Sequence, residues 1–317
     1  MKLRTLVGAT IGAVGAAAVT NRVLDRQADE LAPPLPGESG TYRWRGFDIA
    51  YTEAGEPDDD DLVLLHGINA AATSREWRTV FETLSEDYHV VAPDLPGFGR
   101  SDRPPLTYSA SLYTTFVRDF LTDRNGDATV VASSLTGAYA AAAARDVDIS
   151  RLVLVCPTAD TVPGRRVWLR SLVRTPVLGQ AVYNAIGSER SIRYFHDDHG
   201  YHDISNLDDE TVEYEWQAAH QPGARFAPAS FISGHLDPDV DLADLLANLD
   251  VPITLVWGRE TDMPPLSVGR ELAETADVEL ISVGDSALLP HVEHPDEFRQ
   301  IVRGRPVEAS EPTDADE

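Results

Sequence analysis

The residue of this sequence best placed for nucleophilic chemistry is a serine that follows a short apolar run. The run at 128–132 leads through Ser133 and Ser134 into an alanine-rich stretch with a helical pattern. A serine on a tight turn between a strand and a helix is held exposed, where its hydroxyl can attack a carbonyl carbon. Such a turn needs small residues two positions before and after the nucleophile, and Ala132 and Thr136 meet this need when the turn is centred on Ser134. The spacing therefore predicts Ser134 as the nucleophile.

The segments that would position this serine alternate between short apolar runs and helical patterns. Apolar runs occur at 62–65, 89–92, 128–132, 152–155, 253–257 and 278–283, after two alternating segments at 42–44 and 47–51. Continuous apolar runs are typical of strands that are buried on both faces of a parallel sheet. Helical patterns separate them, as at 77–84, 109–121 and 266–276. The alternation predicts an α/β fold with a mostly parallel, doubly wound sheet.

The stretch from 157 to 251 interrupts this alternation. It contains several helical patterns and many aromatic residues but no comparable apolar run. A stretch of this length is not a simple loop, and open α/β sheets bind ligands at the carboxyl ends of their strands. We therefore predict a core at 41–156 and 252–303, a helical lid at 157–251 and an acidic disordered tail at 304–317. The proline-containing residues 25–40 are predicted to be a linker.

Four segments of the sequence together indicate a known family. They are the Leu-His-Gly at 65–67, the glycine-containing loop at 94–104, the serine turn, and the Pro-His-Val-Glu-His-Pro stretch at 290–295. Over about residues 40–303 the chain resembles the α/β-hydrolase superfamily, in its esterase and epoxide-hydrolase-like branch. The resemblance implies the α/β-hydrolase fold with an inserted helical lid, and it favours hydrolytic chemistry.

The resemblance also implies two backbone donors and an acid for the site. The N–H groups of Ile68 and Leu135 would hold the oxyanion of an acyl-transfer reaction. His66 would be a structural residue that fixes the loop before Ile68. The candidate acid is Asp262, one residue beyond the position the family uses, with a solvated surface aspartate as the competing interpretation. Asp160 is a less favoured substitute.

The position where the family has its catalytic base is occupied by Leu288, which cannot move a proton. A serine hydroxyl is a weak nucleophile without an adjacent base. His291 is the candidate replacement, with His294 and the lid residue His235 as weaker ones. A structural role for His291, at the start of the terminal helix, competes with the catalytic one.

Two functions follow from these residues. The first is a serine hydrolase that acts on an ester or a related apolar acyl substrate through Ser134, with His291 as base and Asp262 as its orienting acid. The second is a pseudo-hydrolase that binds an apolar ligand or a partner without turnover, because Leu288 replaces the usual histidine. Chemistry through an alkyl-enzyme ester is disfavoured, since no aspartate occupies the serine turn.

The charge of the chain limits its partners. The chain has 52 acidic and 26 basic residues, which gives a formal net charge of −26. Such a surface is typical of halophilic proteins, in which high salt screens the self-repulsion. It would repel phosphate, so nucleic acid is not an expected partner. We expect a small apolar substrate instead.

The sequence predicts no cofactor and no metal centre. The single cysteine, Cys156, ends an apolar run, where a small buried residue is the usual interpretation. His196, His199 and His202 lie among aspartates with a spacing that one helical face could use for a metal. In a chain with so many acidic residues such a cluster is expected by chance, and we do not predict a metal there.

Two segments predict contact with a membrane. Residues 6–24 are mostly apolar and follow Lys2 and Arg4, so residues 1–24 are predicted to be a membrane anchor or a signal. Without such an attachment the protein is expected to be cytoplasmic. The stretch from Arg165 to Arg174 combines four arginines with tryptophan, leucine and valine, which is typical of helices that lie on a bilayer surface. A lid helix whose arginines pair with nearby carboxylates is the competing interpretation.

Overall fold

The computed structural model describes residues 2–124 and 126–305, and its centre is one eight-stranded sheet with the order β1-β2-β4-β3-β5-β6-β7-β8. The strands are β1 (Glu38–Trp44), β2 (Phe47–Ala54), β3 (Asp61–Leu65), β4 (His89–Pro93), β5 (Thr129–Ser133), β6 (Arg151–Val155), β7 (Ile253–Gly258) and β8 (Glu279–Val283). β1 and β2 pair antiparallel, β2 joins β4 antiparallel, and the other pairings are parallel. The predicted mostly parallel α/β sheet is confirmed.

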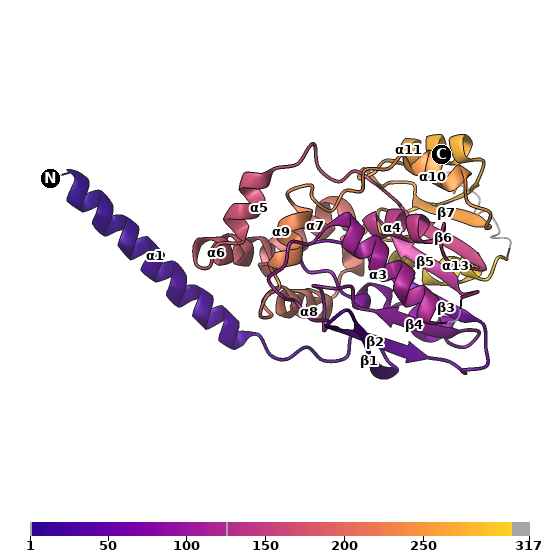
Figure 1. Ribbon diagram of the computed structural model, residues 1–317, viewed down its shortest axis with the longest axis horizontal. Coiled ribbons are helices and arrows are strands. Elements are labelled where there is room, and N and C mark those ends of the chain that lie inside the picture. The colour runs from indigo at the N-terminus through magenta and orange to yellow at the C-terminus, as the bar shows by residue number, and fades with distance from the viewer. Residues whose placement is uncertain (1, 125, 306–317) are drawn as a thin grey trace, which may run out of the picture.

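Helices cover both faces of this sheet (Figure 1). The helices between the strands and after the last one are α2 (Phe81–Leu84), α3 (Ala110–Asp123), α4 (Leu135–Ala143), α11 (Leu266–Ala276), α12 (Pro290–Glu293) and α13 (Pro295–Val302), and a short 3-10 helix, η1 (Ser74–Trp77), precedes α2. One buried cluster joins Val130 of β5 to aromatic residues of α3 and α4. A second joins Val131 to Phe81 of α2 and Phe298 of α13. Successive residues of β5 thus face opposite cores, which explains why its sequence does not alternate.

The chain between β6 and β7, which we call the inserted segment, is helical. It contains α5 (Val167–Val173), α6 (Leu178–Ile186), α7 (Glu189–Phe195), a π-helical turn η2 (His196–Gly200), a 3-10 turn η3 (Ile204–Asn206), α8 (Asp209–Ala219), α9 (Phe226–Phe231) and α10 (Leu242–Ala247). Most of these helices gather at one end of the sheet, whereas α10 lies beside α11 and packs with α4 (Figure 1). That end contains the carboxyl ends of the central strands, where Ser134 follows β5.

The N-terminal helix α1 (Lys2–Gln27) touches the rest of the molecule near its C-terminal end and extends away from it (Figure 1). The Asn21 side chain donates to the carbonyl oxygen of Val177 at 3.0 Å and accepts from the Asn184 side chain at 3.0 Å. Within residues 2–124 and 126–305, no helix reaches the length and hydropathy that crossing a bilayer requires.

The two ends of the core differ in detail from the sequence-based boundaries. β1 begins at Glu38, inside the range predicted as a linker, and Leu31 and Leu35 of that range are buried. Leu35 packs in the second core cluster, so this stretch is attached to the domain along its length. Of the predicted acidic tail, Gly304 and Arg305 are described, and the residues from 306 onward lie outside the described residues.

Candidate active site

Ser134 lies on a strained turn between β5 and α4. Its backbone has φ 52° and ψ −130°, a conformation that costs a residue other than glycine roughly 1–3 kcal/mol. The strain is held in place because the Ser134 N–H donates to the Val155 carbonyl at 2.8 Å and α4 begins at the next residue. The larger Thr136 fits because its hydroxyl donates to the His66 carbonyl at 2.7 Å. The turn predicted from the sequence therefore has the geometry of a nucleophile elbow.

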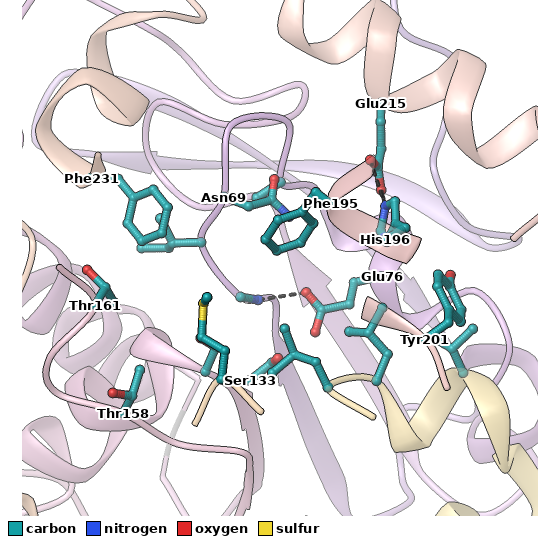
Figure 2. A pocket seen from close by; sticks show the side chains of 18 of the residues that line it. Asn69, Glu76, Ser133, Thr158, Thr161, Phe195, His196, Tyr201, Glu215 and Phe231 are labelled. Atoms are coloured by element: carbon teal, nitrogen blue, oxygen red, sulfur yellow. Dashed lines mark hydrogen bonds and ion pairs between the residues drawn. The ribbon is translucent and has the colours of Figure 1, made fainter. Parts of the chain in front are cut away.

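Ser134 lines a cavity of about 360 Å³ between the carboxyl end of the sheet and the inserted segment. Figure 2 shows labelled side chains of this cavity from both parts of the chain. The apolar side chains that line it are Ile68, Ala72, Phe195, Phe231, Met263, Pro264, Pro265, Leu288, Leu289 and Val292. Most of the exposed wall of the cavity is thus apolar, and polar and charged side chains from both parts of the chain complete it.

The loop after β3 lies directly against the elbow. A Cβ atom on Gly67 would be 3.6 Å from Ser134 Cβ, so the backbone of Gly67 and Ile68 passes beside the serine. His66 fixes this loop: its Nε2 accepts from the Leu95 N–H at 2.9 Å, which leaves Nδ1 to donate to the Gly67 carbonyl at 2.6 Å. Burial lowers the pKa of His66, which keeps the ring neutral for these two bonds.

The same loop is also fastened to the inserted segment. The Tyr183 hydroxyl of α6 donates to the Ala70 carbonyl at 2.5 Å, and Ala71 is buried in a cluster with Val173 of α5. Leu135, the other candidate oxyanion donor, is the first residue of α4. The first N–H groups of a helix have no acceptor within the helix, so the Leu135 N–H is free of intrahelical bonds.

The structure does not bring His291 to Ser134, which corrects the sequence-based assignment of this histidine. Its ring is fully buried beside Trp77, at a centroid distance of 4.5 Å, and beside Phe298 at 5.5 Å. It is not among the residues that line the cavity, because the short helix α12 directs it into the second core cluster. Burial lowers its pKa to about 3, so the ring is neutral.

Asp262 is likewise away from His291. It lines the cavity, but its carboxylate is largely exposed and lies 3.1 Å from Nδ1 of His199 in the inserted segment. It therefore does not orient His291, the base predicted from the sequence. His294 and His235 also have other partners: the first lies 2.9 Å from the Asp285 carbonyl, and the second contacts Ser233.

Among the described residues, His196 is the one histidine that lines the cavity, and both of its nitrogens are occupied or blocked. Its Nε2 lies 3.0 Å from each oxygen of Glu215. A Cβ atom on Gly200 would be 2.7 Å from its Nδ1, so this second nitrogen is covered by backbone. His196 and His199 thus face different carboxylates and do not converge on one point.

Glu76 is the residue of this site that sequence reasoning missed. It lies in η1, and its Oε2 accepts from the Gly67 N–H at 2.8 Å. Figure 2 shows its carboxylate inside the cavity, between Ser133 and the pair formed by His196 and Glu215. Burial is the largest cause of a rise in its pKa to about 7. In so acidic a chain one more glutamate gives no sequence signal, and its position just before the buried Trp77 was the one available hint.

Comparison with known proteins gives matches over most of the chain. The model of a family described as the alpha/beta hydrolase family matches residues 62–301. The 2-hydroxy-6-oxo-6-(2'-aminophenyl)hexa-2,4-dienoic acid hydrolase of Metapseudomonas resinovorans is 33% identical over 96 residues, which cover 29% of this chain and 32% of that enzyme. The chain thus spans about a third of that relative's length.

Two further matches extend along the chain. The uncharacterized hydrolase YugF of Bacillus subtilis is 25% identical over 268 residues, 79% of this chain and 91% of that protein. The crystal structure of a variant of the meta-cleavage product hydrolase CumD superposes with a TM-score of 0.65 at 25% identity, over 84% of this chain and 96% of that one. These matches agree with the α/β fold built on a mostly parallel sheet.

Proposed function

Because the chain belongs to the alpha/beta hydrolase family, we propose that it is a serine hydrolase in which Ser134 attacks an ester or a related apolar acyl compound. The observation that carries this proposal is the left-handed backbone of Ser134 at the wall of a largely apolar cavity. A strained turn of this kind persists only where the surrounding structure enforces it, and such strain is concentrated at functional sites.

The backbone N–H groups of Ile68 and Leu135 are the proposed oxyanion donors. As the Ser134 oxygen bonds to the carbonyl carbon, negative charge develops on the carbonyl oxygen, and donors fixed in advance stabilise it. Support comes from the loop at Gly67, which lies against Ser134, and from the position of Leu135 in the first turn of α4. Both donors belong to the backbone, so their side chains do not restrict the chemistry.

The charges around the cavity favour a neutral substrate. Four carboxylates line it, those of Glu76, Asp160, Glu215 and Asp262, together with the side chains of Arg75 and Arg78. Arg75 is engaged with Glu210 at 2.9 Å, and Arg78 donates to the Tyr201 hydroxyl at 3.1 Å. The relative from Metapseudomonas resinovorans is named for an acid substrate. Here a carboxylate would meet more negative than positive charge, so we favour an uncharged ester.

The proposal is tested by measuring covalent labelling and ester turnover in molar salt. Wild-type protein should react with a fluorophosphonate probe and hydrolyse a short-chain nitrophenyl ester, and Ser134→Ala should do neither. Ser150→Ala is the matched control, since it removes the hydroxyl of an exposed serine outside the cavity and should leave both the label and the turnover as in wild type. No Ser134-dependent labelling would overturn the proposal and favour a fold that binds a ligand without turnover.

We also propose that α5 places the protein on a membrane surface. Val167 and Trp168 of this helix are 57% and 66% exposed, and Leu178 at the start of α6 is 50% exposed. Of Arg165, Arg166, Arg170 and Arg174, none forms an ion pair with a carboxylate in the part of the chain that the structure describes. Arg174 instead donates to the carbonyls of Pro105 and Leu106. Exposed apolar side chains beside arginines without a carboxylate partner fit the boundary between acyl chains and anionic headgroups.

A further inference from the structure

Glu76 is a buried carboxylate in the cavity wall. It has no role in the attack by Ser134 or in the stabilisation of the oxyanion as proposed above. Its side chain is 14% exposed, and one oxygen, Oε1, has no hydrogen-bond partner among the described residues. An ionised carboxylate is expensive to bury unless its environment compensates it. A function for this carboxylate would explain why it is buried beside the elbow.

Three functional groups surround the backbone of Gly67. A Cβ atom at this glycine would be 3.2 Å from Ser133 Oγ, 3.3 Å from Glu76 Oε2 and 3.6 Å from Ser134 Cβ. Glu76 Oε2 and the Ser133 hydroxyl, which bond each other, thus lie against the same glycine as the Cβ atom of Ser134. The absence of a side chain at Gly67 leaves the space beside it open to a proton transfer or to a bridging water.

Other bases are excluded by their geometry. Leu288 occupies the usual position of the histidine, and His291 lies in the core. His196 has one nitrogen against Glu215 and the other under the backbone of Gly200. Among the described residues, no histidine is thus placed as the base, and Glu76 is the cavity carboxylate that lies against the Gly67 backbone beside the elbow.

We propose that Glu76 is the general base and acid of this site and replaces the histidine of the usual triad. The proposal rests on the proposed function, since it gives Ser134 its proton acceptor. A carboxylate can serve in this way when it lies within reach of the hydroxyl, directly or through one water. The neutral ring of His291 packs behind Glu76, with its Nε2 3.4 Å from Glu76 Oε1 and no hydrogen bond between them.

The reaction balances with these groups and one water. Glu76 takes the Ser134 hydroxyl proton as the serine oxygen bonds to the ester carbonyl carbon, and the carbonyl electron pair moves onto the oxyanion. When the oxyanion collapses, the bond to the alkoxide breaks and Glu76 returns the proton to the leaving alcohol. Water then attacks the acyl-enzyme, Glu76 takes a proton from it, and Ser134 leaves with a proton as the acid is released.

The protonation state of Glu76 suits both halves of this cycle. Burial raises its pKa to about 7, and the nearby Glu215 carboxylate acts in the same direction. Arg78, the Ser133 hydroxyl and the Gly67 N–H favour the charged form and limit the rise. The other titratable or charged groups that face it or share its cavity are Arg75, Asp160, His196, Asp262 and the neutral His291. Since the base must be ionised to accept a proton, turnover should increase as the pH rises through about 7.

The experiment is a pH profile of kcat/KM for a nitrophenyl ester, with the rate of fluorophosphonate labelling as a second readout. Wild type should increase to a plateau with an apparent pKa of about 7. Glu76→Gln, which keeps an oxygen for the Gly67 N–H, should be slower by about 10²-fold or more and should lack this inflection. Glu76→Ala should regain part of its rate in formate but not in chloride. Glu82→Gln, an exposed change on α2, is the matched control and should behave as wild type.

Each other result counts against the proposal. If Glu76→Gln is slower by the same factor at every pH and keeps the inflection, Glu76 is only a structural residue of the Gly67 loop. If Glu76→Gln keeps the wild-type rate, the proton acceptor is another group, although Ser134 retains its role. If wild-type protein shows no Ser134-dependent labelling, the proposed function fails and the role of Glu76 fails with it. Circular dichroism of each variant checks that the fold is retained.

Discussion

The two pairs of loops at the carboxyl end of the sheet differ in how well they suit catalysis. The loops after β3 and β5 hold Ser134 in its strained conformation and place the Gly67 backbone beside it. The loops after β7 and β8 would supply the acid and the base, but Asp262 faces His199 and His291 lies in the core. The first pair works through backbone geometry, which tolerates a substitution such as Thr136, whereas the second depends on side-chain identity. A change such as Leu288 therefore removes the base while it leaves the elbow intact.

The largest effect is expected in the first pair of loops. Ser134→Ala removes the nucleophile, so kcat/KM for a nitrophenyl ester should decrease by at least about 10³-fold. Thermal unfolding should stay close to wild type, because only one oxygen is lost from a half-buried position. If the variant keeps most of the wild-type rate, the loops after β3 and β5 are not the reacting pair and the comparison fails.

Glu76 should make stability depend on pH with a definite sign. Its pKa is raised from an ordinary 4.5 to about 7, so the folded state holds the proton more tightly than the unfolded chain. Its contribution therefore decreases as the pH rises between these two values, by up to about 3 kcal/mol. Glu76→Gln cannot ionise and should be more stable than wild type at pH 8 but not at pH 4, as measured by denaturant unfolding in molar salt. An equal difference at both pH values would contradict the raised pKa.

His291→Ala should affect stability more than chemistry. The ring packs against Trp77 and Phe298, and its removal leaves a cavity in the core, so the free energy of unfolding should decrease by about 2–4 kcal/mol. The rate per folded molecule should decrease far less than in Glu76→Gln. If His291→Ala loses as much activity as Ser134→Ala while it remains folded, the histidine has a catalytic role and the contrast between the loops is smaller than proposed.

The inserted segment should bind anionic vesicles through α5. Changing Arg165, Arg166 and Arg170 together to glutamine should weaken co-sedimentation with phosphatidylglycerol vesicles by about tenfold or more, since each basic residue near such a surface contributes about 1 kcal/mol. The matched control changes three exposed arginines of the core, Arg145, Arg259 and Arg270, and should bind as wild type.

Protein that lacks residues 1–30 separates the two predicted membrane contacts. If this truncated protein no longer sediments with the vesicles, α5 has no part in binding. If both arginine sets behave alike, the surface of α5 is not the contact. Concentration-dependent dimerisation that depends on Trp168 would instead indicate that a second copy of the chain covers this face.

The smallest effect is expected at Asp262. Its carboxylate is 65% exposed and orients no base beside Ser134, so Asp262→Asn should change kcat/KM by less than about twofold. A loss of 100-fold or more would show that the loop after β7 takes part in the reaction after all.

The fold and the elbow could be predicted from the sequence, because both depend on patterns within short segments. Continuous apolar runs indicated the buried strands, and the small residues around Ser134 indicated its turn. The partners of Ser134 could not be found in this way. Glu76, the proposed base, comes from η1 and lies against Gly67 because the loop after β3 packs beside the end of β5. Likewise, whether the residue at 291 points into the core or into the cavity depends on how α12 packs against distant residues, which a pattern within this short segment does not indicate.

The hydrogen bond between Tyr183 and Ala70 has a consequence for engineering. It joins the part of the chain that shapes the ligand space to the loop that would stabilise the transition state. The inserted segment is therefore not an interchangeable module. A chimera that takes this segment from another protein to change the substrate range would have to retain the tyrosine and its carbonyl partner. Otherwise the exchange would also change the position of the loop that contains Gly67.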